Sequence, residues 1–130
     1  MGDKKRVLII DDERDICQFT KTVLERNGRF EVFVSSDSTS GIEMVKRNKP
    51  DIILLDINMP GLDGGDIAQT LGDFSMTRDI PIIFVTGLLK KEELALKDKG
   101  KVGRHYFIAK PVTPKELIEK IEAVLNEVGL

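Results

Sequence analysis

Five side chains spread along this chain have the chemical types needed to handle a phosphoryl group. They are the carboxylates of Asp11, Asp12 and Asp56, the hydroxyl of Thr86 and the ammonium of Lys110. Each follows a short apolar run, and if those runs are parallel strands, their carboxyl ends line one edge of a sheet. Carboxylates, a hydroxyl and an ammonium that meet there suit a divalent cation together with a phosphoryl group.

The paired acids Asp11 and Asp12 have two interpretations. Neighbouring carboxylates repel each other unless a cation neutralises them. Mg²⁺ usually takes one or two carboxylates plus phosphate oxygens. The alternative is that both acids cap the helix that follows and complement its dipole. Taken with Asp56, Thr86 and Lys110, the pair favours a metal site.

Asp56 closes a very apolar run and has the character of a nucleophile. A carboxylate can accept a phosphoryl group as an aspartyl-phosphate, and a simple turn residue ahead of Pro60 is the alternative. The compact ammonium of Lys110 suits a phosphoryl oxygen; otherwise it is a surface lysine. Thr86 could donate its hydroxyl to the same group, although β-branched residues are also common in strands.

The elements that must position these residues alternate regularly between strand and helix. Short, nearly continuous apolar runs are typical of strands buried on both faces in a parallel sheet. Right-handed crossovers then give a doubly wound sheet. The expected strands are 6–10, 30–34, 52–55, 80–85 and 104–108, and the expected helices lie near 13–27, 38–48, 67–74, 91–99 and from 113 onward.

Two helices have specific sequence signals. The first has an apolar stripe that predicts its core face: Ile16, Phe19, Val23 and Leu24. In the last, Thr113 as N-cap, Pro114 and Glu116 form a capping box. Its predicted buried face is Leu117, Ile118, Ile121, Val124, Leu125 and Val128.

Bulk properties narrow the class of protein. The chain of 130 residues, with a net charge of −2, is expected to be a single domain spanning 1–130 without an output domain. It lacks the basic excess that nucleic-acid binding favours, and its apolar runs are too short to cross a membrane. The lone Cys17 cannot form an internal disulfide and is expected to be a buried thiol. These features predict a cytoplasmic protein.

Four stretches together resemble the receiver domain of two-component response regulators. They read VLIIDDE, PDIILLDINMPGLDG, IPIIFVTG and FIAKP, and they span nearly the whole chain. The resemblance implies a flavodoxin-like α/β fold, a five-stranded parallel sheet of order 2-1-3-4-5 with five helices. It also implies two-component signal transduction by a phosphoprotein.

The same resemblance assigns roles at the acidic site. Asp56 would accept a phosphoryl group from a histidine kinase or a histidine phosphotransfer protein. Asp12 and Asp56 would bind Mg²⁺ directly, with the backbone carbonyl of Asn58 as a further ligand and Asp11 acting through water. The chain would catalyse only its own phosphorylation and slow dephosphorylation, without a separate substrate.

Further roles are implied for residues that sense the phosphoryl group. Thr86 and Lys110 would contact it, and the Lys110–Pro111 peptide would be cis. Phe107 would occupy the aromatic switch position, where the family more often has a tyrosine. The segment KDKGKVGRHYF also departs from the family pattern. An unidentified downstream protein could bind the 91–128 face.

Two other functions remain as alternatives. A degenerate receiver would act as a constitutive interaction module, although the intact set of five residues argues against it. An aspartate-nucleophile phosphatase would commonly have an acid two residues after the nucleophile, where this chain has Asn58. A dinucleotide-binding domain is disfavoured because no Gly-x-Gly-x-x-Gly follows the first strand.

Overall fold

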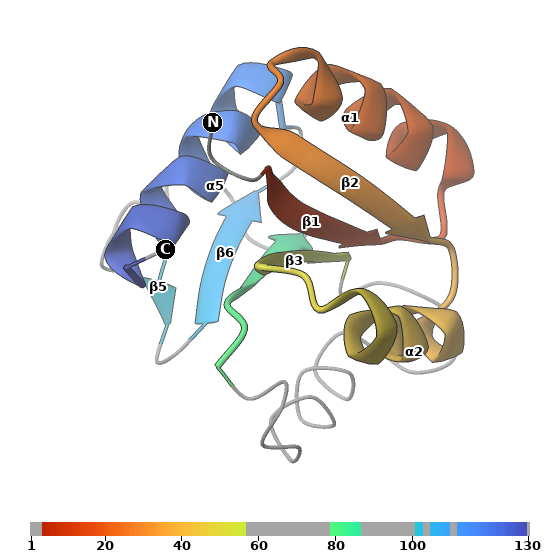
Figure 1. Cartoon of the computed structure of the whole chain (residues 1–130). Coiled ribbons are helices and arrows are strands. Elements are labelled where there is room, and N and C mark those ends of the chain that lie inside the picture. Colours follow the sequence, from red (N-terminus) through yellow and green to blue (C-terminus); the bar gives the residue numbers. More distant parts are fainter. Residues whose placement is uncertain (1–3, 57–78, 87–100, 103–104, 110–111, 130) are drawn as a thin grey trace.

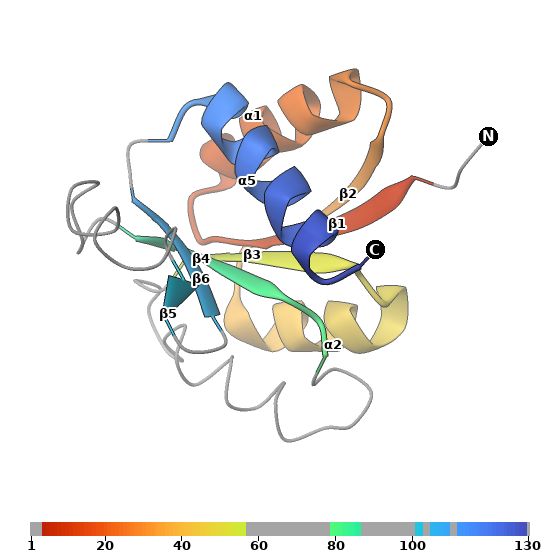
Figure 2. The same cartoon turned by 90° about the vertical axis from the view of Figure 1, so that its left-hand side faces the viewer.

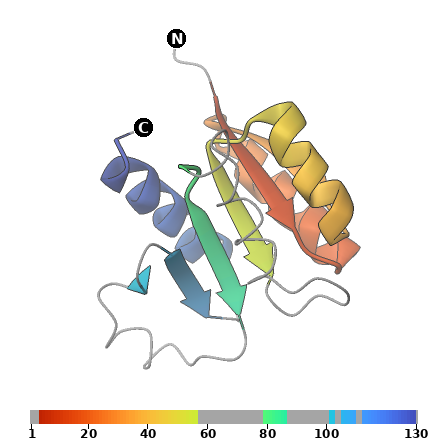
Figure 3. The same cartoon turned by 90° about the horizontal axis from the view of Figure 1, so that it is seen from below.

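The computed structural model describes residues 4–56, 79–86, 101–102, 105–109 and 112–129, and their strands form one sheet of order β2-β1-β3-β4-β6-β5. Five of the strands run parallel, and Figure 3 shows the arrows of β1, β3, β4 and β6 pointing the same way. This confirms the predicted five-stranded parallel sheet of order 2-1-3-4-5, with β6 as its fifth strand. The parallel strands are β1 (Lys5–Ile10), β2 (Phe30–Ser35), β3 (Ile52–Asp56), β4 (Ile82–Thr86) and β6 (His105–Ala109).

A sixth strand, β5 (Lys101–Val102), was not predicted and pairs antiparallel with β6 at the sheet edge. Its residues belong to the segment that departs from the family pattern. Only two residues separate Val102 from its partner His105 in the sequence, which is the spacing of a tight hairpin. A strand of two residues is too short to give a periodic signal, so sequence analysis missed it.

Helices cover both faces of the sheet. Helices α1 (Arg14–Arg26) and α5 (Pro114–Glu127) lie together on one face, and α2 (Ser38–Asn48) lies on the other (Figures 1 and 2). The helices expected near 67–74 and 91–99 lie outside the described residues. Within the part of the chain that is described, no helix has the length and apolarity needed to cross a membrane.

Side-chain caps fix where two of the helices begin. The carboxylate of Asp37 accepts a hydrogen bond from the Ser40 N–H at 2.8 Å at the start of α2. At α5 the Thr113 hydroxyl accepts from the Glu116 N–H at 3.1 Å, and Glu116 reaches back to the Thr113 N–H. This is the predicted capping box, which satisfies N–H groups that the helix itself cannot pair.

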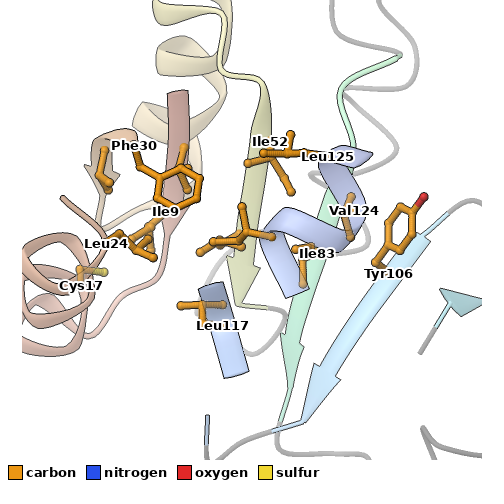
Figure 4. Packing of buried hydrophobic residues seen from close by; sticks show 14 residues of the cluster. Ile9, Cys17, Leu24, Phe30, Ile52, Ile83, Tyr106, Leu117, Val124 and Leu125 are labelled. Carbon is orange, nitrogen blue, oxygen red and sulfur yellow. The ribbon is translucent and has the colours of Figure 1, made fainter. Parts of the chain in front are cut away.

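The alternation of side chains along each strand divides the core in two. On β1, Ile9 packs toward α1 and α5 whereas Leu8 and Ile10 pack toward α2. Figure 4 shows the cluster on the α1 and α5 side, in which side chains from the sheet meet Leu24 of α1 and Leu125 of α5. Burying a large aliphatic side chain contributes about 1.5–3 kcal/mol. Burial on both faces explains why the strands read as continuous apolar runs.

The predicted core stripe of α1 is wrong for two residues. Ile16 is 46% exposed and Phe19 is 61% exposed, whereas Cys17 and Leu24 are buried. The side chains that face the core are Cys17, the half-buried Thr20 and Leu24. Cys17 and Thr20 are only weakly apolar, so the apolar pattern of the sequence does not indicate this face. The buried thiol predicted for Cys17 is confirmed.

The predicted buried face of α5 is mostly right. Leu117, Ile121, Val124 and Leu125 are buried, and Ile118 packs partly buried against them. Val128 is exposed, because the helix ends at Glu127 and the chain turns there.

Candidate functional site

Three of the predicted site residues lie together at the carboxyl end of the sheet. Asp11 directly follows β1 and Asp56 ends the neighbouring β3, with Ile10 opposite Leu55 in the register. One carboxylate oxygen from each of Asp11, Asp12 and Asp56 lies within 4.8 Å of the other two. Asp11 and Asp56 are only 7% and 3% exposed, whereas Asp12 faces solvent. The parallel pairing of β1 and β3 therefore creates the acidic cluster.

Backbone and side-chain hydrogen bonds hold Asp11 in place at three atoms. Its N–H donates to the Ser35 carbonyl at 3.1 Å, which ties it to the end of β2. Its Oδ1 accepts from the Glu13 N–H at 2.9 Å, the pattern of an Asx turn. Its carbonyl accepts from the Cys17 thiol at 3.4 Å. An aspartate before a helix hints at the Asx turn, but nothing in the sequence pointed to a contact between the Cys17 thiol and Asp11.

The Cys17 thiol lies close to the negative charge of the cluster. Burial, together with the charges of Asp11, Asp12 and Asp56, raises the pKa of this thiol from 9.0 to about 12. Both effects disfavour the thiolate. Cys17 therefore stays protonated near neutral pH and keeps the hydrogen that it donates to Asp11.

A cavity of about 520 Å³ adjoins the acidic cluster. It lies between α1 and α5, above the sheet, and its walls are mostly apolar. Its lining among the described residues is Ile9, Ile10, Asp11, Ile16, Cys17, Thr20, Leu54, Asp56, Val85, Val112 and Leu117. Two of the three clustered carboxylates therefore border an apolar space as well as one another.

The other predicted site residues are placed less completely. Thr86 ends β4, the strand next to Asp56 on the side away from β1; its side chain is outside the described set. Phe107 lies in β6, where its ring is half-buried and stacks on Phe84. Asn58 and Lys110, with the Lys110–Pro111 peptide, lie outside the described residues.

The acidic cluster has the composition of a site for a hard cation. Its donors are carboxylate oxygens from three residues, which are the ligands that Mg²⁺ prefers. Like charges this close destabilise one another, and a bound divalent cation offsets that repulsion. The described donors therefore fit Mg²⁺ chemically.

A doubly wound parallel sheet with acids at its carboxyl edge defines a flavodoxin-like α/β domain with a ligand site at the strand ends. Residues 7–122 match the response regulator receiver domain family, and this chain belongs to that family. Receiver domains are signalling domains of two-component systems, so the resemblance found in the sequence is confirmed.

Similar proteins include regulators and solved receiver structures. The phosphate regulon transcriptional regulatory protein PhoB of Escherichia coli is 35% identical over 126 residues, covering 96% of this chain and 53% of PhoB. The chemotaxis protein CheY4 of Vibrio cholerae has a TM-score of 0.80 at 27% identity, covering 95% of this chain and all of that one. A CheY-like receiver domain protein from Methanospirillum hungatei matches with a TM-score of 0.80 at 29% identity, covering 97% of each chain. The chain spans about half the length of the curated relatives it matches.

Proposed function

We propose that this chain is a phosphorylation-controlled switch whose phosphoacceptor is Asp56. The observation that carries the proposal is the cluster of Asp11, Asp12 and Asp56 at the carboxyl ends of β1 and β3. Among these acids, Asp56 ends a central strand and is the most buried. A carboxylate held rigidly at a strand end suits nucleophilic attack, which requires alignment more than activation.

Mg²⁺ would be held by the same cluster. Asp12 and Asp56 would bind it directly, Asp11 through water, and the Asn58 backbone carbonyl would complete the protein ligands. When bound, the cation neutralises negative charge on the incoming phosphoryl group and on Asp56. The hydrogen bonds to Asp11 from Glu13 and Cys17 would keep this ligand set oriented.

The chemical step is the transfer of a phosphoryl group from a donor atom to a carboxylate oxygen of Asp56. A carboxylate oxygen of Asp56 forms a bond to phosphorus as the bond from phosphorus to the donor breaks. The donor is a phosphohistidine nitrogen of a kinase or phosphotransfer protein, or the acyl oxygen of a small acyl phosphate, and it leaves with the bonding electron pair. Later attack by water on phosphorus releases inorganic phosphate and restores the Asp56 carboxylate.

The phosphoryl group would then change the population of two conformations. Lys110 would pair with one of its oxygens, and the Thr86 hydroxyl would move to another. Phe107 would follow Thr86 and alter the surface seen by a downstream protein on the 91–128 face. A local change of charge at Asp56 would thereby alter partner binding at a distant surface.

A protein donor has to contact the surface around Asp56. The first turns of α1 border this site, and Ile16 lines the cavity that reaches Asp56. Ile16 and Phe19 are large apolar side chains exposed on that helix. Apolar residues of this kind form the desolvated centre of protein interfaces, so we assign this part of α1 to the donor kinase or phosphotransfer protein.

Intact mass after incubation with acetyl phosphate tests the phosphoacceptor. The wild type should gain the mass of one phosphoryl group when Mg²⁺ is present and none when it is chelated. Asp56→Ala should gain nothing. Asp15→Ala removes an exposed carboxylate of the first turn of α1 that is not part of the cluster, and it should behave as the wild type.

The alternatives give different results in the same experiment. A chain that gains no mass with any donor or metal concentration acts as a constitutive interaction module instead. Steady release of phosphate from a phosphomonoester, beyond one turnover per chain, indicates a phosphatase. A gain of mass that survives Asp56→Ala moves the phosphoacceptor to another residue.

A further inference from the structure

The half-buried ring of Phe107 is stacked on another aromatic side chain. The ring centroids of Phe84 and Phe107 are 5.1 Å apart, and the ring planes differ by 26°. The two residues are direct partners in the pairing of β4 with β6. Phe84 is buried in the apolar cluster on the α2 side of the sheet, and Phe107 packs against the same cluster.

The sheet connects this aromatic pair to the phosphoacceptor over a short path. Val85, the residue after Phe84, lies opposite Asp56 in the pairing of β3 with β4. Thr86 is the next residue and ends the strand. A displacement of the end of β4 toward Asp56 therefore reaches Phe84 within two residues, and reaches Phe107 through the stacked rings.

The chemistry of Phe107 leaves packing, of which this stack is a part, to set the orientation of its ring. A phenylalanine ring has no hydroxyl, so no hydrogen bond can set its position, whereas the tyrosine more common at this position could form one. Packing alone must therefore hold the ring, and offset-stacked aromatic pairs contribute beyond their buried area. In the described part of the chain, Phe84 is the aromatic ring that supplies this contact.

We propose that Phe84 is a positioning residue for the switch, holding Phe107 in the unphosphorylated arrangement until Thr86 moves. The proposal rests on the proposed function, because it assumes that phosphorylation of Asp56 displaces Thr86 and Phe107. Removing the ring of Phe84 then destabilises the unphosphorylated arrangement selectively. The population of the activated arrangement rises, and any ligand that prefers it binds more tightly.

Beryllofluoride, a phosphoryl analogue that binds carboxylates, is the probe for this equilibrium. Its apparent dissociation constant is measured by backbone amide NMR at a fixed Mg²⁺ concentration, on the wild type and on Phe84→Leu. We expect Phe84→Leu to bind about 2- to 10-fold more tightly, the factor that corresponds to the loss of one aromatic pair. Affinity is preferred to the chemical shift of Phe107, because removal of a neighbouring ring alters that shift directly.

Phe33→Leu is the matched control. Phe33 packs against the same apolar cluster, but it lies on β2, which β1 and β3 separate from β4. The variant makes the same chemical change in the same cluster without touching Phe107, and it should bind beryllofluoride as the wild type does. Phe84→Met, which keeps an apolar side chain of similar length, replaces Phe84→Leu if the latter does not fold.

A double-mutant cycle with Phe107→Leu isolates the contact between the rings. Phe107→Leu alone should tighten binding, and adding Phe84→Leu should give no further gain. Equal affinities for Phe84→Leu and Phe33→Leu, or fully additive gains in the cycle, overturn the role of Phe84. If the wild type binds no beryllofluoride and takes no phosphoryl group on Asp56, the proposed function fails and this inference fails with it.

Discussion

The thiol of Cys17 donates a hydrogen bond to the backbone carbonyl of Asp11 at 3.4 Å. This contact joins the buried face of α1 to the turn that carries two carboxylates of the acidic cluster. The thiol is therefore both a core side chain and a neighbour of the proposed metal site. Because burial and the nearby carboxylates raise the pKa of this thiol, its ionisation is coupled to the stability of the fold.

Stability is expected to fall as the pH rises above about 9, because the pKa of the folded Cys17 thiol lies near 12. In the unfolded chain the thiol ionises from pH 9, so the unfolded state loses a proton that the folded state keeps. Between the two pKa values, the free energy of unfolding should therefore fall by up to about 1.4 kcal/mol per pH unit.

Urea unfolding of the wild type and of Cys17→Ala, from pH 8 to pH 10.5, measures this effect. Subtraction of the two curves isolates the thiol from other groups, including Lys120, whose pKa burial lowers. The difference between the proteins should shrink as the pH rises. A difference that is constant with pH contradicts the raised pKa.

Neutralising one acid of the cluster should stabilise the protein without metal and abolish its response to Mg²⁺. Asp12→Asn removes one of three carboxylates within 4.8 Å, and relief of repulsion at this exposed position should contribute about 0.5–1 kcal/mol. The wild type should gain about 1.4 kcal/mol in Mg²⁺ at ten times its dissociation constant. Thermal unfolding with and without Mg²⁺ measures both changes.

Asp15→Asn serves as the control for that experiment, because it removes a nearby charge, in the first turn of α1, that is not part of the cluster. It should keep the full response to Mg²⁺. Equal Mg²⁺ responses in Asp12→Asn and the wild type rule out Asp12 as a ligand.

Gly41→Ala, in α2, should destabilise the protein by up to about 2 kcal/mol. A Cβ at this position would lie 2.8 Å from Cδ1 of Ile10, which is fully buried on β1. Overpacking a core costs about 1–3 kcal/mol, and the better helix propensity of alanine offsets about 1 kcal/mol of that cost. Urea unfolding measures the loss.

Ile10→Val provides the rescue for Gly41→Ala, because it deletes the Cδ1 atom that the new Cβ would meet. The double variant should therefore be less destabilised than the sum of the two single variants. Strictly additive changes in the free energy of unfolding would mean that a Cβ at position 41 does not clash with the Ile10 side chain.

Thr113→Ala should destabilise the fold by about 1 kcal/mol through loss of the cap of α5. The Thr113 hydroxyl accepts the hydrogen bond of the Glu116 N–H at 3.1 Å, so its removal leaves a helix donor without that acceptor. Thr22→Ala is the matched control, because that hydroxyl bonds the Gln18 carbonyl within the exposed part of α1. It should be neutral or slightly stabilising, and equal losses in both variants would exclude a specific cap.

Local patterns in the sequence were sufficient to place most of the elements. The run Val7–Ile10 is apolar throughout because both faces of the strand are buried, so it reads as a parallel strand. Thr113 and Glu116 predicted the start of α5, since a capping box depends on neighbours in the chain. The orientation of α1 was missed because Cys17 and Thr20 occupy inward positions and the apolar Phe19 faces solvent.

The sequence by itself determined which chemical groups stand at the ends of the strands, and it indicated the family through their order. Only the tertiary structure decided which of them meet, because Asp11 and Asp56 come together through the parallel register of β1 and β3. It also placed Cys17 against the Asp11 carbonyl and Phe84 against Phe107. Such contacts arise from strand order and helix rotation, which a one-dimensional pattern does not specify.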